Sequence, residues 1–186
     1  MKVGSGSILS LAVLAAVFFF FSAPSPASAD EGLSILLTSN LEGKFAIETA
    51  ERPDQDPLLV IAQGIIRERK TGRIGLYLDL GNAFYPGPLS KFSYGAVMSE
   101  YLGTLGCDAT LVSSRDLQIG TDHLETLARE GKTRLLSANL MRDKQPLFVP
   151  FALFPAGRDT VAVLAVSSTD IRFDIAEKKL YGVYAA

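Results

Sequence analysis

The sequence predicts an α/β protein built around a mostly parallel β-sheet. Apolar strand patterns alternate with amphipathic helix patterns along most of the chain, and this alternation is typical of parallel strands connected by helices. Two strand patterns near the end follow each other with only a turn between them, which indicates a later antiparallel edge. With 186 residues, the chain has room for one domain and at most a small appendage.

Six apolar runs are predicted to be strands, at residues 33–38, 74–80, 109–113, 134–139, 148–154 and 160–166. The first three are apolar at consecutive positions, so we expect them to be buried on both faces of the sheet. Helix periodicity appears at residues 57–70, 93–105 and 121–130. Asp56 is expected to cap the first helix, with Pro57 at its first position and Gly72 just after its end.

The first 29 residues have the pattern of a signal peptide. Lys2 precedes an apolar run at residues 8–21, and Ala27-Ser28-Ala29 forms a small-residue cleavage motif. The run of 14 residues is shorter than the roughly 20 that a membrane-spanning helix needs. We therefore expect cleavage between Ala29 and Asp30, a periplasmic or secreted protein of residues 30–186, and no stable membrane span after cleavage. An uncleaved membrane anchor is the alternative.

The composition argues against a nucleic-acid partner and against an internal disulfide. The formal net charge is -2 and no basic patch appears, so a nucleic-acid partner is not expected. Cys107 is the single cysteine, which fits an exported chain without an internal disulfide. Its place ahead of an apolar strand predicts a buried, unreactive thiol.

Three blocks of the sequence resemble one known family. Residues 35–45 (ILLTSNLEGKF) resemble the opening strand and loop of bacterial periplasmic 5'-nucleotidases and related calcineurin-like metallophosphoesterases. Residues 78–120, which begin LDLGN and end SSRDLQIG, resemble the next block of that family, and residues 135–140 (LLSANL) a later strand. The resemblance runs from Leu33 to about Thr169 and implies the N-terminal portion of a layered metallophosphoesterase sandwich.

The family uses two divalent metal ions to clamp a phosphoryl group and activate water. The positions that match its metal motifs hold other side chains here: the first-loop aspartate and histidine correspond to Asn40 and Glu42, the bridging aspartate to Asn82, and an Asn-His pair to Ser114 and Arg115. The later histidine-bearing blocks have no counterpart, and His123, the only histidine, lies in a predicted helix away from the motifs. We therefore expect no catalytic residue, no metal site and no cofactor.

The same positions allow two interpretations. In the simpler one, Asn40, Asn82 and Ser114 bond to local backbone, as loop residues commonly do, and Arg115 pairs with Glu42 or Asp116. In the other, Arg115, Ser114, Asn40 and Asn82 bind a small anion such as phosphate or a nucleotide in the space of the lost metals.

The sequence thus predicts an exported, non-catalytic, metallophosphoesterase-like protein that binds a partner or a small anion. One alternative is a 5'-nucleotidase-like phosphohydrolase with altered ligands, in which Glu42 retains a single ion. Another is a truncated fragment of a longer 5'-nucleotidase-like protein. Because the last strand pattern offers only a partial second layer over the sheet, we also expect exposed apolar surface and either self-association or a protein partner.

Overall fold

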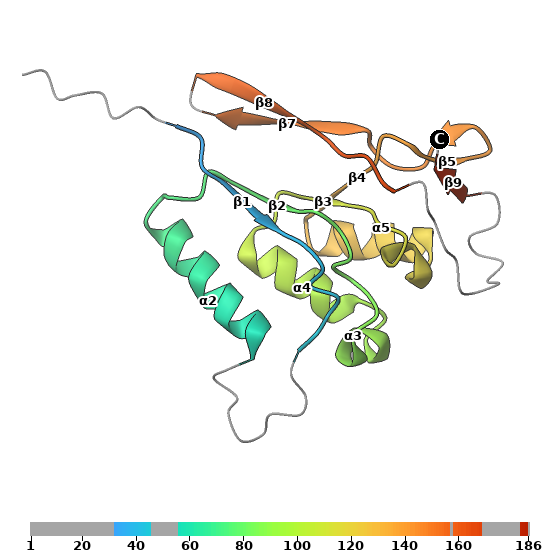
Figure 1. The fold of residues 1–186 in the computed structure, drawn as a ribbon, viewed down its shortest axis with the longest axis horizontal. Coiled ribbons are helices and arrows are strands. Elements are labelled where there is room, and N and C mark those ends of the chain that lie inside the picture. Colours follow the sequence, from blue (N-terminus) through green and yellow to red (C-terminus); the bar gives the residue numbers. More distant parts are fainter. Residues whose placement is uncertain (1–31, 46–55, 157, 169–182, 186) are drawn as a thin grey trace, which may run out of the picture. The chain divides into compact units, whose positions relative to one another are not determined.

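A four-stranded parallel sheet lies at the centre of the fold (Figure 1). The computed structural model describes residues 32–45, 56–156, 158–168 and 183–185. All of these residues except Gly32 belong to one compact unit, Leu33–Ala186. The strand order follows the sequence: β1 (Ile35–Thr38), β2 (Leu76–Asp79), β3 (Ala109–Leu111) and β4 (Arg134–Leu136). The predicted parallel α/β fold is confirmed, and each strand is shorter than the apolar run that predicted it.

Helices cover one face of this sheet (Figure 1): α2 (Pro57–Lys70), α4 (Ala96–Leu105) and α5 (Thr121–Glu130). The Asp56 carboxylate caps α2 as expected, accepting hydrogen bonds from the backbone N–H of Leu58 and Leu59 at 2.8 and 3.3 Å. Leu124 and Leu127 of α5 are fully buried, as their spacing predicted. On α2, however, the apolar Ile66 is 40% exposed.

The second predicted helix begins later than expected. Residues before it form a separate short helix, α3 (Pro88–Phe92), which the sequence reading did not predict. Tyr94 and Gly95 then take φ angles of 50° and 84°, which no α-helix accommodates, so α4 starts only at Ala96. A further unpredicted turn, the 3-10 helix η2 (Asp116–Ile119), precedes α5.

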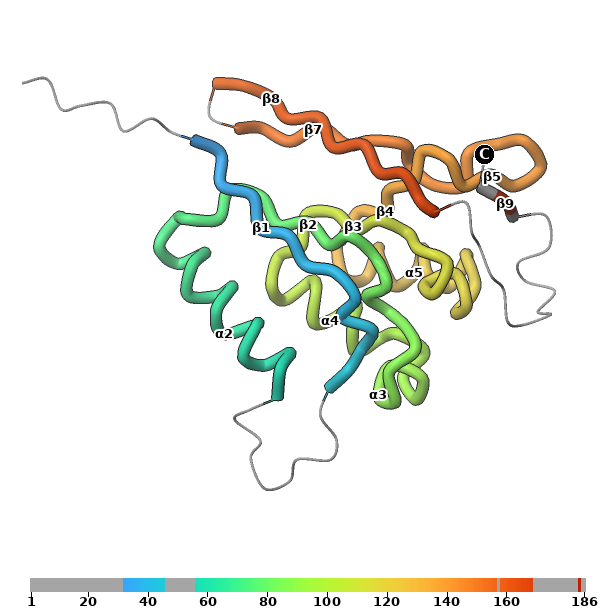
Figure 2. Tube along the Cα trace, viewed as in Figure 1, coloured from blue at the N-terminus to red at the C-terminus, as the bar shows by residue number. Residues whose placement is uncertain are grey.

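The opposite face of the sheet is covered by the antiparallel hairpin of β7 (Phe151–Ala156) and β8 (Asp159–Leu164) (Figure 2). Ala152, Phe154 and Val163 of the hairpin pack on Leu76 and Leu136 of the sheet. A second antiparallel sheet joins β5 (Leu140–Arg142) to β6 (Gln145–Pro146) and β9 (Val183–Ala185). These antiparallel strands form small sheets of their own instead of extending an edge of the parallel one.

The expectation that the first strand is buried on both faces is wrong. Ile35 and Leu37 are 44% and 53% exposed, whereas Leu76 and Leu78, which they adjoin on β2, are buried. The cause is the position of β1 at the end of the sheet, beyond the reach of the hairpin. Apolar surface therefore remains exposed among the described residues, as the partial second layer predicted.

No helix within the described ranges is long and apolar enough to cross a membrane. The signal peptide predicted at residues 1–29 and its cleavage site lie outside those ranges.

Candidate functional site: the loops after β1, β2 and β3

The loops that follow β1 and β2 are joined backbone to backbone. Asn40 N–H donates to the carbonyl oxygen of Gly81 at 3.0 Å, and Glu42 N–H donates to that of Asn82 at 2.8 Å. The carboxyl ends of parallel strands meet at one edge of a sheet, so three of the predicted site residues are brought together. Asn40, Glu42 and Asn82 have φ angles of 55°, 53° and 55°, a left-handed conformation that asparagine tolerates better than glutamate.

The side-chain amides of these loops bond to each other. The Asn82 amide donates to Oδ1 of Asn40 at 2.7 Å, and Oδ1 of Asn82 accepts from the Ser113 hydroxyl at 2.6 Å. This chain of hydrogen bonds connects the ends of the first three strands. The Asn40 amide oxygen therefore accepts a hydrogen bond, and the Asn82 amide oxygen shares the single Ser113 proton with Oδ2 of Asp116, which is also 2.6 Å away.

Glu42 is the one carboxylate among the predicted site residues, and two cations hold it. It is only 5% exposed and forms ion pairs with Arg115 and with Lys44, whose Nζ lies 2.5 Å from Oε2. The ion pair between Arg115 and Glu42 that the simpler interpretation expected is therefore present. The Arg115 side chain is 48% exposed, so this ion pair lies at the protein surface.

Two further acids support the loops, and the sequence reading did not single them out as site residues. Asp116 is 1% exposed and accepts from the backbone N–H of Asn82, Phe84 and Ser113 at 2.9 to 3.1 Å. Burial raises the pKa of this carboxyl, and the hydrogen bonds from Ser113, Phe84 and Asn82 oppose the rise. Asp116 thus ties the loop after β2 to the loop after β3.

Asp79 plays a similar part inside β2. It accepts from Thr38 Oγ1 at 2.7 Å, from Gly81 N–H at 2.9 Å and from Thr110 Oγ1 at 3.1 Å. Burial raises the pKa of Asp79 to about 6. The three hydrogen bonds favour the charged form and oppose this rise, and the bond from Thr38 opposes it most. The sequence did contain a signal for this role of Asp79. It is a lone carboxylate in an otherwise apolar strand, and a buried acid needs hydrogen-bond partners.

The remaining predicted residues lie apart from this network. Ser114 is half-buried and makes no side-chain hydrogen bond to another described residue. His123 is exposed on α5, where Nε2 donates to the Tyr94 carbonyl oxygen at 2.8 Å. Cys107 is buried as predicted, and burial raises the pKa of its thiol.

The donor set does not fit the two metal ions of the resembled family. A dinuclear site needs several carboxylates or imidazoles to offset two dications. Here Glu42 is already paired with two cations, and Asn82 donates to Asn40. The other two carboxylates, Asp79 and Asp116, are buried and accept hydrogen bonds from backbone N–H and hydroxyl groups. No group of three or more His, Cys, Asp or Glu side chains within the described ranges is arranged to hold a metal.

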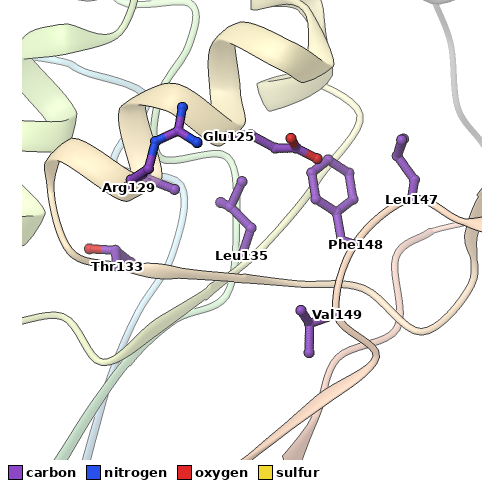
Figure 3. Close-up of a pocket in the computed structure, with 8 residues that line it drawn as sticks. Glu125, Arg129, Thr133, Leu135, Leu147, Phe148 and Val149 are labelled. Carbon is purple, nitrogen blue, oxygen red and sulfur yellow. The ribbon is translucent and has the colours of Figure 1, made fainter.

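A separate pocket of about 430 Å³ lies beside α5, away from the strand-end loops (Figure 3). Leu135, Phe148 and Val149 form apolar walls, and Glu125 and Arg129 project from α5 at its border. None of the predicted site residues contributes to it.

The sheet, its two covering layers and the loops define a calcineurin-like phosphoesterase fold, in the form of that fold's N-terminal portion. Among solved structures, the chain is similar to a 5'-nucleotidase precursor from Thermus thermophilus, with TM-score 0.65 and 15% identity. It is also similar to the calcineurin-like phosphoesterase YfkN from Bacillus subtilis, with TM-score 0.64 and 19% identity. A third similar structure is the sulfate thiohydrolase SoxB from Thermus thermophilus, with TM-score 0.58 and 22% identity.

These similarities extend over much of this chain and a smaller share of the others. They cover 83%, 82% and 69% of this chain, but 32%, 53% and 24% of the 5'-nucleotidase, YfkN and SoxB respectively. No protein-family model matches the sequence, and no curated protein matches it. At this level of identity the comparisons show the fold, and they confirm the predicted fold class.

Proposed function

We propose that this chain is a non-catalytic protein on a phosphoesterase fold, and that it acts by binding a partner. The observation that carries the proposal is the pairing of Glu42 with both Arg115 and Lys44. In a metal-dependent phosphohydrolase the corresponding edge of the sheet presents free anionic ligands to cations. Here positively charged side chains occupy the space beside the one carboxylate, and they repel a divalent cation.

Metal analysis and a hydrolysis assay test this proposal together. The purified chain is expected to contain no stoichiometric manganese, zinc or iron, and to hydrolyse nucleotides and aryl phosphates no faster than a protein-free blank. Two bound ions per chain, with hydrolysis that is lost on Asn82→Ala, would establish the phosphohydrolase alternative and overturn the proposal.

A second candidate function is binding of a small anion at Arg115. Arg115 and Lys44 place two positive charges beside the negative charge of Glu42, and the Arg115 side chain is 48% exposed. Arginine binds phosphate without a metal ion. If it does so here, inorganic phosphate raises the melting temperature, and the free energy of unfolding rises with the logarithm of the phosphate concentration, by about 2.7 kcal/mol at a hundredfold excess over Kd. Arg115→Ala should abolish this shift, and Arg67→Ala, at an exposed arginine on α2, should retain it.

Export is part of the proposed function. The charged start, the apolar run at residues 8–21 and the Ala27-Ser28-Ala29 motif support cleavage before Asp30 and release into the periplasm or the medium.

A further inference from the structure

The pocket beside α5 is bounded on one side by a segment that the backbone fixes to its neighbours (Figure 3). Leu147 N–H donates to the carbonyl oxygen of Leu140 at 2.9 Å, and Ser137 N–H donates to that of Val149 at 3.0 Å. The wall is therefore formed before any ligand arrives. The pocket volume of about 430 Å³ lies within the roughly 300–1,000 Å³ that is usual for small-molecule sites.

The floor of this pocket is apolar, and its rim carries two opposite charges. Ala128, Leu135 and Phe148 line it and are buried members of the main hydrophobic core. Glu125 and Arg129 line it from α5 and are exposed. A floor of this kind accepts an apolar group, and the few polar groups at the rim select what that group is attached to.

The two rim charges do not neutralise each other. Glu125 and Arg129 lie one helical turn apart, a spacing that commonly forms a salt bridge. No ion pair within the described ranges involves either side chain. Arg129 donates one hydrogen bond, to Thr126 Oγ1 at 3.2 Å, and Glu125 points toward Phe148 (Figure 3). The rim thus presents an anion and a cation that are both available to a ligand.

The gaps in the described chain are bordered by residues that lie elsewhere. Phe45, which precedes residues 46–55, packs on α4, and the cap of α2 follows them. Residues 169–182 lead into β9, which pairs with β5. Arg142 of β5 donates to Thr121, at the end of α5 that is farther from the pocket. Export as proposed above removes the signal peptide, so a ligand from outside the chain is the favoured occupant.

We propose that this pocket binds a free amino acid with a large apolar side chain. The apolar side chain lies on Leu135 and Phe148, the ligand carboxylate accepts two hydrogen bonds from the Arg129 guanidinium, and the ligand ammonium pairs with Glu125. A zwitterion matches both rim charges at once, whereas a fatty acid would place a second anion beside Glu125. The site is separate from the strand-end loops, so this inference goes beyond the binding role proposed above.

Titration with L-tryptophan tests the pocket, because the chain contains no tryptophan of its own. When excitation is set beyond the tyrosine absorption band, only the ligand fluoresces, and its anisotropy should rise saturably with the concentration of purified chain. L-leucine, which does not fluoresce, should displace it. Arg129→Gln and Glu125→Gln should each weaken binding by about three- to tenfold, because each removes one charge-assisted contact.

Matched controls separate these contacts from a general effect of charge. Glu130→Gln on α5 and Arg67→Gln on α2 replace exposed residues that do not line the pocket, and should leave the affinity unchanged. Two ligand analogues assign the partners. Tryptamine lacks the carboxylate and should be insensitive to Arg129→Gln, and N-acetyl-L-tryptophan lacks the ammonium and should be insensitive to Glu125→Gln.

Three results would overturn the proposal. Equal affinity of L-tryptophan for the Arg129→Gln and unaltered chains would show that the apolar floor alone binds it, as would equal affinity of tryptamine and L-tryptophan for the unaltered chain. Absence of saturable binding by both amino acids is the third. In that case, protection of Val149→Cys from a maleimide would show that another part of the chain fills the pocket. None of these results depends on metal content or hydrolysis, so failure here leaves the non-catalytic proposal standing.

Discussion

The side-chain amide of Asn82 donates a hydrogen bond to the side-chain oxygen of Asn40 over 2.7 Å, across the gap between two strand-end loops. Two carboxylates at the same separation would repel each other strongly unless a cation lay between them. The neutral amides replace that repulsion with attraction. The loops can therefore close on each other without an ion.

Asn82→Ala tests what this closure contributes. The substitution removes the bonds to Asn40 and Ser113 and also places alanine at a φ of 55°. We expect the free energy of unfolding, measured in urea, to fall by about 1–2 kcal/mol. Asn82→Gly accepts the same φ without strain and so isolates the hydrogen bonds. If the glycine variant is as stable as the unaltered chain, the amide bonds contribute nothing.

The ion pair of Glu42 with Arg115 should be measurable by a double-mutant cycle with Glu42→Gln and Arg115→Ala. Glu42 is buried but the Arg115 side chain is 48% exposed, so solvent screens part of the attraction. We expect a coupling of about 1 kcal/mol at neutral pH, falling with added salt. The exposed pair of Arg67 and Glu68 is the control and should show almost none. A coupling that salt leaves unchanged would contradict this account.

Asp79→Asn should stabilise the protein above neutral pH. The folded chain keeps the Asp79 proton up to about pH 6, against a usual pKa of 3.8. Its contribution therefore favours folding in acid and is lost as the pH rises from about 4 through 6. Asparagine is neutral at every pH and retains acceptors for Gly81 and Thr110. We expect a gain of up to about 3 kcal/mol at pH 8, from two pKa units, and almost none at pH 4. If the Asp79→Asn variant is less stable than the unaltered chain at both pH 4 and pH 8, the hydrogen bonds to Asp79 compensate for the burial of its charge.

Two glycine-to-alanine substitutions should have opposite effects. A Cβ at Gly64 in α2 meets nothing within 4 Å, so Gly64→Ala should stabilise the chain by about 0.5–1 kcal/mol through helix propensity. A Cβ at Gly87 would lie 2.3 Å from the Gly43 carbonyl oxygen and 2.5 Å from that of Glu42. Because both are backbone atoms, Gly87→Ala should cost about 1–3 kcal/mol and loosen the loop that holds Glu42. Thermal unfolding of both variants measures the difference, and equal effects would argue against close packing at Gly87.

Processing at the amino terminus is the fifth prediction. Chain exported by a bacterial host should begin Asp30-Glu31-Gly32 when sequenced from its amino end. Recovery of membrane-bound chain that starts at Met1 would instead support an uncleaved anchor.

The sequence predicted the parallel sheet and its covering helices because local signals and packing agree there. The Asp56 cap and the spacing of Leu124 and Leu127 each predicted a feature that the structure shows. The short elements α3 and β6 were missed because neither has a pattern of its own. The burial of β1 was overestimated because an apolar run does not reveal whether a strand lies at the centre or at the end of a sheet.

For the candidate site, the sequence located the residues but not their bonds. Asn40, Glu42 and Asn82 meet because parallel strands end at one edge, which the strand pattern implies. Glu42 pairs with Lys44 of its own loop and with Arg115 of the loop after β3. This double pairing depends on the paths of both loops, which the sequence pattern does not reveal. Asp79 and Asp116 were not singled out as site residues, since each acts through backbone and hydroxyl donors that only the folded chain assembles.

The loops at the end of β1 and β2 are joined by the amides of Asn40 and Asn82, and Lys44 and Arg115 pair with Glu42 beside them. Chelators or metal starvation should then leave the abundance of the folded protein unchanged.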